Sequence, residues 1–406
     1  MNLSFENPFK PGAGHNPPYL AGRTEETNEF LKLINQKTIL SNLVLTGLRG
    51  VGKTVLLNRF KSLAIENKWL WVGTDLSESA SISEHALAHR LITDIASATS
   101  HITFNTTEKI SIGFSINKEL QSERLSYENL LKIYESIPGL AVDKLKGVLE
   151  IVWHFLKSSG HKGLIFAYDE AQTIDDQSAK DQYPVALLLD TFQSIQRKDI
   201  PFMLALAGLP TLFPKLVDSR TFAERMFRIV FLNKLSPEES REAIVKPIEQ
   251  AQCPIKFSDA HIKVVVQQSA GYPYFIQYLC KEIYDGFIQQ RRVNQPLSIP
   301  IDAIINKLDS DFFAGRWAKV TDRQRDLLAV IALLESDGEE FTVQEIASAS
   351  KQYPMGSFSS SHVNQMLVAL AKSGLVYKNR YGKYSFAVPL LEQFIRRQNI
   401  LTKKPV

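Results

Sequence analysis

One segment of eight residues, Gly47–Thr54 (GLRGVGKT), constrains the fold more than any other part of this 406-residue chain. It fits the pattern G-x-x-x-x-G-K-[ST] and lies between a short apolar strand predicted for 38–46 and an amphipathic helix predicted for 53–67. Glycines let backbone N–H groups turn inward around phosphate oxygens, and the start of a helix adds partial positive charge. The segment therefore predicts a phosphate-binding loop made by Gly47, Gly50, Val51, Gly52, Lys53 and Thr54.

The last two residues of the motif carry most of its expected chemistry. Lys53 is expected to reach the β- and γ-phosphates of a nucleotide, and the Thr54 hydroxyl is expected to be a ligand of Mg²⁺. A glycine turn followed by a surface lysine is the alternative. The predicted strand and helix on either side favour the phosphate site.

A second segment, Leu164–Glu170 (LIFAYDE), reads as a buried strand that ends in two acids. The carboxyl ends of parallel strands meet at one edge of a sheet, which is also where a phosphate loop lies. Asp169 is therefore expected to hold Mg²⁺ through water, and Glu170 to polarise the attacking water. Many strands end in an acid at solvent, but the phosphate loop upstream favours the catalytic interpretation.

Strand and helix patterns alternate along the first part of the chain. Apolar strands are predicted at 38–46, 70–76, 164–168, 202–207 and 228–232, and helices at 53–67, 82–97, 141–158 and 184–197. Buried strands that alternate with helices indicate an α/β fold whose parallel sheet is covered on both faces. Residues 98–140 lose this periodicity and are predicted to be an insertion.

The pattern changes after the last strand, and we predict four regions. An irregular arm (1–20) precedes an α/β nucleotide-binding domain (21–235), and an all-helical module follows at 236–317, opened by a capping box at Ser236. In the last region (318–406), three helices at 322–335, 342–350 and 359–373 precede two strands at 375–379 and 383–388. This order is typical of a winged helix-turn-helix.

Charge and cysteine content bear on the partners and the compartment. Residues 351–406 carry nine Lys or Arg and one Glu, whereas the whole chain has a net charge of only +4. A basic tail on a near-neutral body suggests a polyanion partner, although a solvated basic surface is the alternative. Two cysteines, no apolar run long enough for a membrane span and no secretory signal predict a cytoplasmic protein without a membrane partner.

Several ordered motifs make the sequence resemble the AAA+ ATPases of the origin-recognition and cell-division-control type. The resemblance covers nearly the whole chain apart from 98–140. The matching stretches are Ala21–Glu26, Gly47–Thr54, Asp169–Gln172, Ala207–Pro210, Phe222–Phe227, Gly271–Gln277, Leu308–Phe313 and Phe386–Leu390. The family implies a P-loop nucleotide domain, a helical lid and a C-terminal winged helix, with ATP and Mg²⁺ as ligands.

The resemblance also implies roles for single residues. It places Gly22 and Arg23 beside the adenine. Arg225 occupies the position from which an arginine reaches the γ-phosphate of a neighbouring subunit and stabilises charge during phosphoryl transfer. Arg220 and Arg228 are the alternatives for that role. A homo-oligomer in the ATP state is therefore expected.

Two positions depart from the family's pattern. The strand at 202–207 should end in a polar sensor residue, yet Leu204–Gly208 is apolar and Thr211 is the nearest hydroxyl. The lid helix often carries an arginine after Gly-x-Pro, where this chain has Tyr274, and Lys281 two turns on is an alternative cation. These departures predict slow hydrolysis or a long-lived ATP state.

Two functions of different classes follow. In the first, an ATPase couples ATP binding and hydrolysis to duplex DNA through its winged helix, with Lys378, Arg380 and Lys383 in contact with the phosphate backbone. Initiators, loaders, mobile-element proteins and defence components are of this kind. In the second, a nucleotide-dependent switch uses the same domain to lock a closed form or to bind an effector protein encoded elsewhere. The absence of arginine from the helix at 359–373 favours the second, and the basic tail favours the first.

Overall fold

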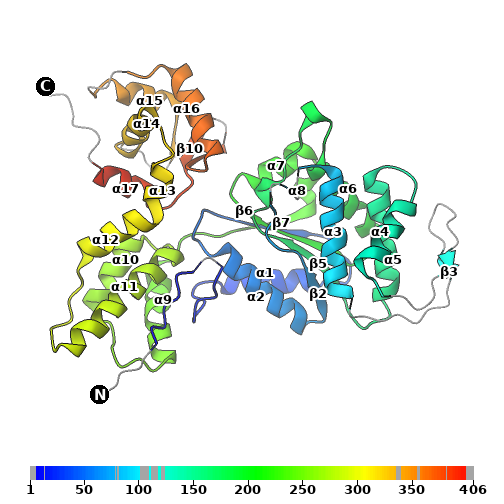
Figure 1. Cartoon of the computed structure of the whole chain (residues 1–406), viewed down its shortest axis with the longest axis horizontal. Coiled ribbons are helices and arrows are strands. Elements are labelled where there is room, and N and C mark those ends of the chain that lie inside the picture. The colour runs from blue at the N-terminus through cyan, green and yellow to red at the C-terminus, as the bar shows by residue number, and fades with distance from the viewer. Residues whose placement is uncertain are drawn as a thin grey trace. The chain divides into compact units, whose positions relative to one another are not determined.

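The computed structural model of the chain describes residues 6–12, 14–77, 79, 82–100, 109–110, 118–119, 124–334, 340–353, 357–380 and 382–398 (Figure 1). Two compact units emerge. The sheet unit comprises residues 23–47 and 53–232, and the helical unit comprises residues 1–22, 48–52 and 233–406. Of the described helices, none is both long and apolar enough to cross a membrane.

A five-stranded parallel sheet forms the centre of the sheet unit. Its spatial order is β2-β5-β6-β1-β7, and every neighbouring pair is parallel. The strands are β1 (Asn42–Thr46), β2 (Trp69–Val72), β5 (Gly163–Tyr168), β6 (Phe202–Gly208) and β7 (Phe227–Phe231). Every residue of β1, β5 and β6 is buried, as expected for strands covered on both faces. The predicted α/β fold with a parallel sheet is confirmed.

The helices of the sheet unit cover both faces of this sheet. They are α1 (Thr24–Ile34), α2 (Lys53–Glu66), α3 (Glu84–Thr99), α4 (Tyr127–Ser136), α5 (Ala141–Leu156), α6 (Pro184–Gln196), α7 (Leu212–Ser219) and α8 (Ala223–Met226). Short 3₁₀ turns lie at Ala171–Thr173 and Ser178–Lys180, and a small antiparallel pair joins β3 (Lys109–Ile110) to β4 (Lys118–Glu119).

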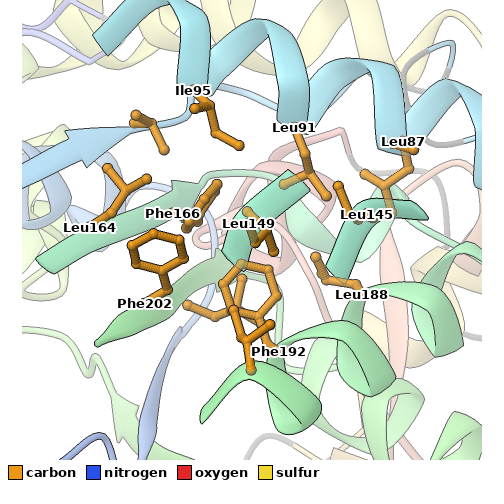
Figure 2. Close-up of a cluster of buried hydrophobic side chains, with 14 of the residues drawn as sticks. Leu87, Leu91, Ile95, Leu145, Leu149, Leu164, Phe166, Leu188, Phe192 and Phe202 are labelled. Atoms are coloured by element: carbon orange, nitrogen blue, oxygen red, sulfur yellow. The ribbon is translucent and has the colours of Figure 1, made fainter. Parts of the chain in front are cut away.

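One hydrophobic core of this unit lies between the sheet and helices α3, α5 and α6, as Figure 2 shows. Alternate residues of a strand point to the same face. Leu164 and Phe166 of β5 therefore join Phe202 of β6 on this side, where the rings of Phe166 and Phe192 meet edge-on at 5.0 Å. The helices contribute the leucine, isoleucine and phenylalanine side chains of Leu87, Leu91, Ile95, Leu145, Leu149, Leu188 and Phe192.

The opposite face is covered by α1 and α2. Phe30 of α1 stacks on Phe60 of α2 with ring centroids 4.3 Å apart. The indole N–H of Trp69 donates a hydrogen bond of 3.0 Å to the carbonyl of Ile34, so this buried tryptophan joins the end of α1 to β2.

Part of the predicted insertion at 98–140 has regular structure. Helix α4 begins after Ser126, whose side chain accepts a hydrogen bond from the N–H of Asn129. Its buried residues Leu130, Ile133 and Tyr134 follow helical spacing and pack with α3 and α5. The sequence analysis missed this helix because it grouped these residues with the aperiodic residues before them. Most of 101–123 lies outside the described residues.

In the helical unit, a run of helices follows the sheet in sequence. They are α9 (Pro237–Gln250), α10 (Asp259–Ser269), α11 (Pro273–Arg292), α12 (Ile301–Leu308), the π-helical turn η4 (Asp309–Phe313) and α13 (Ala314–Trp317). The predicted capping box opens α9, with Ser236 and Glu239 bonding each other's backbone N–H. The irregular arm packs against this group, since Phe9 is buried beside Phe257 and Tyr284.

The last part of the chain contains the predicted three helices and two-stranded hairpin, with two additions. Its elements are α14 (Asp322–Ala332), β8 (Glu340–Phe341), α15 (Val343–Ser350), α16 (Ser360–Lys372), β9 (Val376–Arg380), β10 (Lys383–Phe386) and α17 (Leu391–Arg397). Strand β8 pairs with the hairpin in an antiparallel sheet of order β8-β10-β9. Neither β8 nor α17 was predicted, and the winged-helix assignment stays a prediction.

Candidate functional site

The phosphate-loop motif joins the end of β1 to the start of α2, as predicted. Gly50 and Gly52 have φ angles of +76° and +95°, a region that favours glycine. Lys53 is the first residue of α2, is only 8% exposed and donates a hydrogen bond of 2.9 Å from Nζ to the carbonyl of Gly47. A buried ammonium held against the loop does not fit the surface-lysine alternative.

Thr54, the second residue of α2, connects this helix to the predicted acidic pair after β5. The hydroxyl of Thr54 donates a hydrogen bond of 2.5 Å to Oδ2 of Asp169, which is 4% exposed at the end of β5. The other carboxylate oxygen, Oδ1, accepts a hydrogen bond of 2.8 Å from the N–H of Glu170. Asp169 is therefore held in one orientation facing the start of α2.

Glu170 follows in a left-handed backbone conformation, with φ of +51°. Such a φ is uncommon for a residue other than glycine, and it occurs at turns and functional sites. Oε2 of Glu170 accepts a hydrogen bond from the side-chain amide of Gln172. The Gln172 carbonyl oxygen, Oε1, in turn accepts a hydrogen bond of 3.0 Å from the N–H of Leu209, just beyond β6.

Gln172 brings a polar group to the end of β6, where the sequence shows none. Strand β6 does end in Ala207 and Gly208, as expected. A Cβ at Gly208 would lie 2.6 Å from Oε1 of Gln172, so the glycine leaves room for this amide. Sequence reasoning gave Gln172 no role, although this residue ends the stretch Asp169–Gln172 that matches the family.

A third carboxylate lies at the same edge of the sheet. Asp75, just after β2, pairs with Asp169 in an isolated parallel bridge, and Leu76 N–H donates to the carbonyl of Asp169 at 3.0 Å. Burial raises the pKa of Asp75, and the negative charges of Asp169 and Glu170 raise it further. Three acids at one edge create a site that favours cations.

The protein oxygens at this edge suit Mg²⁺ better than a metal ion whose ligands are all protein side chains. Among the residues that the structure describes, there is no group of three His, Cys, Asp or Glu side chains that could hold a metal ion. Mg²⁺ usually takes one or two protein oxygens and completes its shell with water and substrate phosphates. Thr54 and Asp169 supply two such oxygens, already close to each other.

The residues expected near the adenine are in two different settings. Gly22 has a φ of +63°, and a Cβ there would lie 2.5 Å from the carboxylate of Glu239, so glycine is required. Arg23, just before α1, is 6% exposed and forms an ion pair of 3.1 Å with Glu26. A contact of either residue with a base stays a prediction.

The three arginines considered as donors to the γ-phosphate of a neighbouring subunit differ in their contacts. Arg220 makes two hydrogen bonds to the carboxylate of Asp190, at 3.0 and 2.8 Å. Arg228 pairs with Glu29 at 2.9 Å. Arg225, in α8, is exposed, and no ion pair or side-chain hydrogen bond involves it within the described part of the chain.

The alternative cation of the lid helix is already paired. Nζ of Lys281 lies 2.8 Å from Asp285 and 3.8 Å from Glu282, both in α11. The hydrogen bond to Asp285 is the main cause of the raised pKa of Lys281. Lys281 therefore has a local role within α11, and a contact with phosphate would require breaking that pair.

The predicted DNA contacts lie on the β9–β10 hairpin. Lys378 is exposed, and Lys383 is half-buried and pairs in register with Arg380. The exposed face of α16 carries Ser361, His362, Asn364 and Gln365. Two arginines further on are engaged instead: Arg396 pairs with Glu392, and Arg397 makes two hydrogen bonds to Asp309, at 2.9 and 2.6 Å.

Family comparisons agree with this site. Residues 19–217 match the AAA ATPase domain, and residues 310–395 match a domain of unknown function, DUF8462. A search of curated proteins found no match.

Two solved structures share the fold over nearly the whole chain. A Walker-type ATPase of Pyrococcus abyssi is 17% identical, with a TM-score of 0.54 over 97% of this chain and 99% of that one. The ORC2 protein of Aeropyrum pernix in its ADP form is 14% identical, with a TM-score of 0.55 over 97% and 98%. The predicted P-loop AAA+ fold is therefore confirmed, and at the level of the fold so is the predicted resemblance to AAA+ ATPases of the origin-recognition type.

Proposed function

We propose that the chain, whose residues 19–217 match the AAA ATPase domain, binds ATP at the phosphate loop and hydrolyses it. The observation that carries the proposal is the hydrogen bond from Thr54 to Asp169. It joins the end of the phosphate loop to the acidic pair after β5, so phosphate-binding and water-activating groups share one edge of the sheet.

Each residue has a separate role in the proposed reaction. Lys53 donates hydrogen bonds to oxygens of the β- and γ-phosphates. Glu170 accepts a proton from the water whose oxygen bonds to the γ-phosphorus. The bond from the γ-phosphorus to the bridging oxygen breaks, and ADP and inorganic phosphate leave. Arg225 of a neighbouring subunit donates to the phosphate oxygens as their charge redistributes.

Mg²⁺, when bound, would neutralise charge on the β- and γ-phosphates. Thr54 and Asp169 are the residues that would hold it, since their oxygens are close together and face the phosphate loop's helix. Asp75 strengthens the negative potential at the same edge without being a proposed ligand.

Duplex DNA is the proposed partner of the last part of the chain. Support comes from the exposed Lys378, the polar exposed face of α16 and the excess of basic residues after 350. Contacts of this kind go mainly to phosphates, so affinity should fall steeply with salt. Arg397 is not part of this proposal, because its guanidinium is hydrogen-bonded to Asp309.

A second candidate function, the nucleotide-dependent switch, rests on that same ion pair. Phe394 of α17 also stacks on Phe313 of η4, with ring centroids 4.9 Å apart. Helix α17, the last helix that the structure describes, is thus attached to the π-helical turn by both charge and aromatic contact. Such an attachment suits a C-terminal domain that packs on the preceding helices of the same unit and responds to their state.

One experiment tests the proposal and separates the two candidates. ATP hydrolysis and particle mass are measured together, for wild type and Glu170→Gln, with Mg²⁺ or with EDTA, and with or without duplex DNA. Hydrolysis that needs Mg²⁺ and Glu170 supports the ATPase. DNA that raises turnover and particle mass supports the DNA-coupled function. If DNA changes neither, the switch is favoured, and an absence of wild-type hydrolysis contradicts the ATPase.

A further inference from the structure

The side-chain amide of Gln172 joins three segments that meet at the candidate site. Its Nε2 donates to Oε2 of Glu170, and its Oε1 accepts from the N–H of Leu209. Its own backbone carbonyl accepts a hydrogen bond of 2.8 Å from Nζ of Lys215 in α7. Both ends of the amide and its backbone are therefore fixed by groups on different elements.

This arrangement restricts the carboxylate that the proposed reaction uses as a base. A glutamate side chain has three rotatable bonds, and anchoring one oxygen removes much of that freedom. Oε2 of Glu170 is the anchored oxygen, which leaves Oε1 to accept a proton from water. The side chain of Gln172 is itself hydrogen-bonded to the backbone N–H of Leu209, just beyond β6. The position of the Glu170 carboxylate therefore depends on β6, the strand between β1 and β5.

The surrounding packing preserves the amide's position. Gly208 leaves the space that Oε1 occupies, because a Cβ there would approach it to 2.6 Å. The amide cannot be replaced by a carboxylate without loss, because Glu170 needs a donor and Leu209 needs an acceptor. An amide is the side-chain group that offers one of each at this size.

Resting on the proposed ATPase function, we infer that Gln172 is a positioning residue that orients Glu170 for hydrolysis. It acts through Glu170 and makes no direct contribution to holding ATP. The polar group that orients Glu170 therefore comes from the segment after β5. It does not come from β6, whose own residues at this end are apolar.

The test measures kcat, KM and ATP affinity for three variants in the full-length chain. Gln172→Ala removes the amide, Gln172→Glu keeps its size and the acceptor for Leu209 but removes the donor, and Gly208→Ala crowds the amide without removing it. We expect kcat to fall about tenfold or more in each, since small misplacements of a catalytic group are costly, with ATP affinity within about twofold of wild type. Gln193→Ala, a half-buried glutamine of α6, is the matched control and should leave kcat unchanged.

A double variant separates positioning from general damage. If Gln172 acts only through Glu170, then adding Gln172→Ala to Glu170→Gln should change the residual rate by less than about twofold. An unchanged or raised kcat in Gln172→Ala overturns the inference, as does a loss of ATP affinity equal to the loss of kcat. Absence of hydrolysis in the wild type overturns the proposed function and this inference together.

Discussion

The Thr54 hydroxyl donates a hydrogen bond of 2.5 Å to the carboxylate of Asp169, although the two residues are 115 positions apart. The contact joins the first turn of α2, the helix that follows β1, to the end of β5, and β6 lies between β1 and β5 in the sheet. An oxygen pair held in this way is prepared to share a hard cation, because each group already faces the other.

The first prediction concerns that oxygen pair. Asp169→Asn removes the negative charge while keeping the side chain's size, so hydrolysis should fall about tenfold or more and the Mg²⁺ concentration for half-maximal rate should rise. Rates are measured across a Mg²⁺ titration. Thr93→Ala, an exposed threonine of α3, serves as the control. A variant with wild-type rate and Mg²⁺ dependence would contradict the assignment of Asp169.

The second prediction concerns the buried lysine of the phosphate loop. Lys53→Ala should weaken ATP binding by about 1.5–3 kcal/mol, the range for hydrogen bonds to charged groups, because the ammonium no longer contacts the phosphates. Titration calorimetry with ATP measures the effect. The matched variant is Lys61→Ala, which removes an exposed lysine from the same helix and should bind ATP normally. Retained affinity in Lys53→Ala would overturn the site.

A third prediction follows from the pairing of the three arginines. Arg225→Ala and Glu170→Gln proteins should each hydrolyse ATP poorly alone, and mixing them should restore part of the rate at hybrid sites. Arg228→Ala replaces Arg225→Ala in the control, since Arg228 is already paired with Glu29. No recovery on mixing, in samples shown to co-assemble, would argue against a role of Arg225 in a neighbouring subunit.

The fourth prediction concerns Asp94, a buried acid of α3 that is bonded to Tyr168, the residue before Asp169. Asp94 is 6% exposed, accepts a hydrogen bond of 2.8 Å from Tyr168 and pairs with Arg90. Burial raises its pKa, and the hydrogen bond from Tyr168 and the charge of Arg90 only partly oppose this. Asp94 therefore binds its proton more tightly when folded, so its contribution to stability is fully present below about pH 4 and is lost as pH rises through the raised pKa.

The measurement is the free energy of unfolding in urea between pH 4 and pH 7. Wild type should lose stability with rising pH relative to Asp94→Asn, whose side chain does not titrate. Parallel pH profiles for the two proteins would mean that the raised pKa has no energetic consequence.

The fifth prediction concerns the hairpin. The double variant Lys378→Glu, Lys383→Glu should weaken duplex DNA binding and flatten its salt dependence while ATP affinity stays unchanged. A second double variant, Lys61→Glu, Lys263→Glu, changes the net charge equally at exposed positions elsewhere. Equal losses in the two double variants would show that net charge alone attracts DNA, and unchanged binding in the first would exclude the hairpin.

The order of strands and helices could be predicted because it depends on local patterns. Short apolar runs such as Leu164–Tyr168, between Gly163 and Asp169, favour buried strands, and the β1–loop–α2 unit follows from its glycines and lysine. Helix α4 was missed because it was grouped with the aperiodic residues before it, and strand β8 because two residues carry too little periodicity. The same limit applies to α17, which follows the hairpin directly.

The sequence alone determined the phosphate loop, Asp169 and Glu170, because their chemistry depends on residue type and spacing along the chain. Only the tertiary structure decided that Gln172 bonds Glu170 and Leu209, and that Arg228 is paired while Arg225 is exposed. These facts depend on which side chains packing brings together. Glu29 and Arg228 are 199 residues apart, and no local pattern records such a pairing.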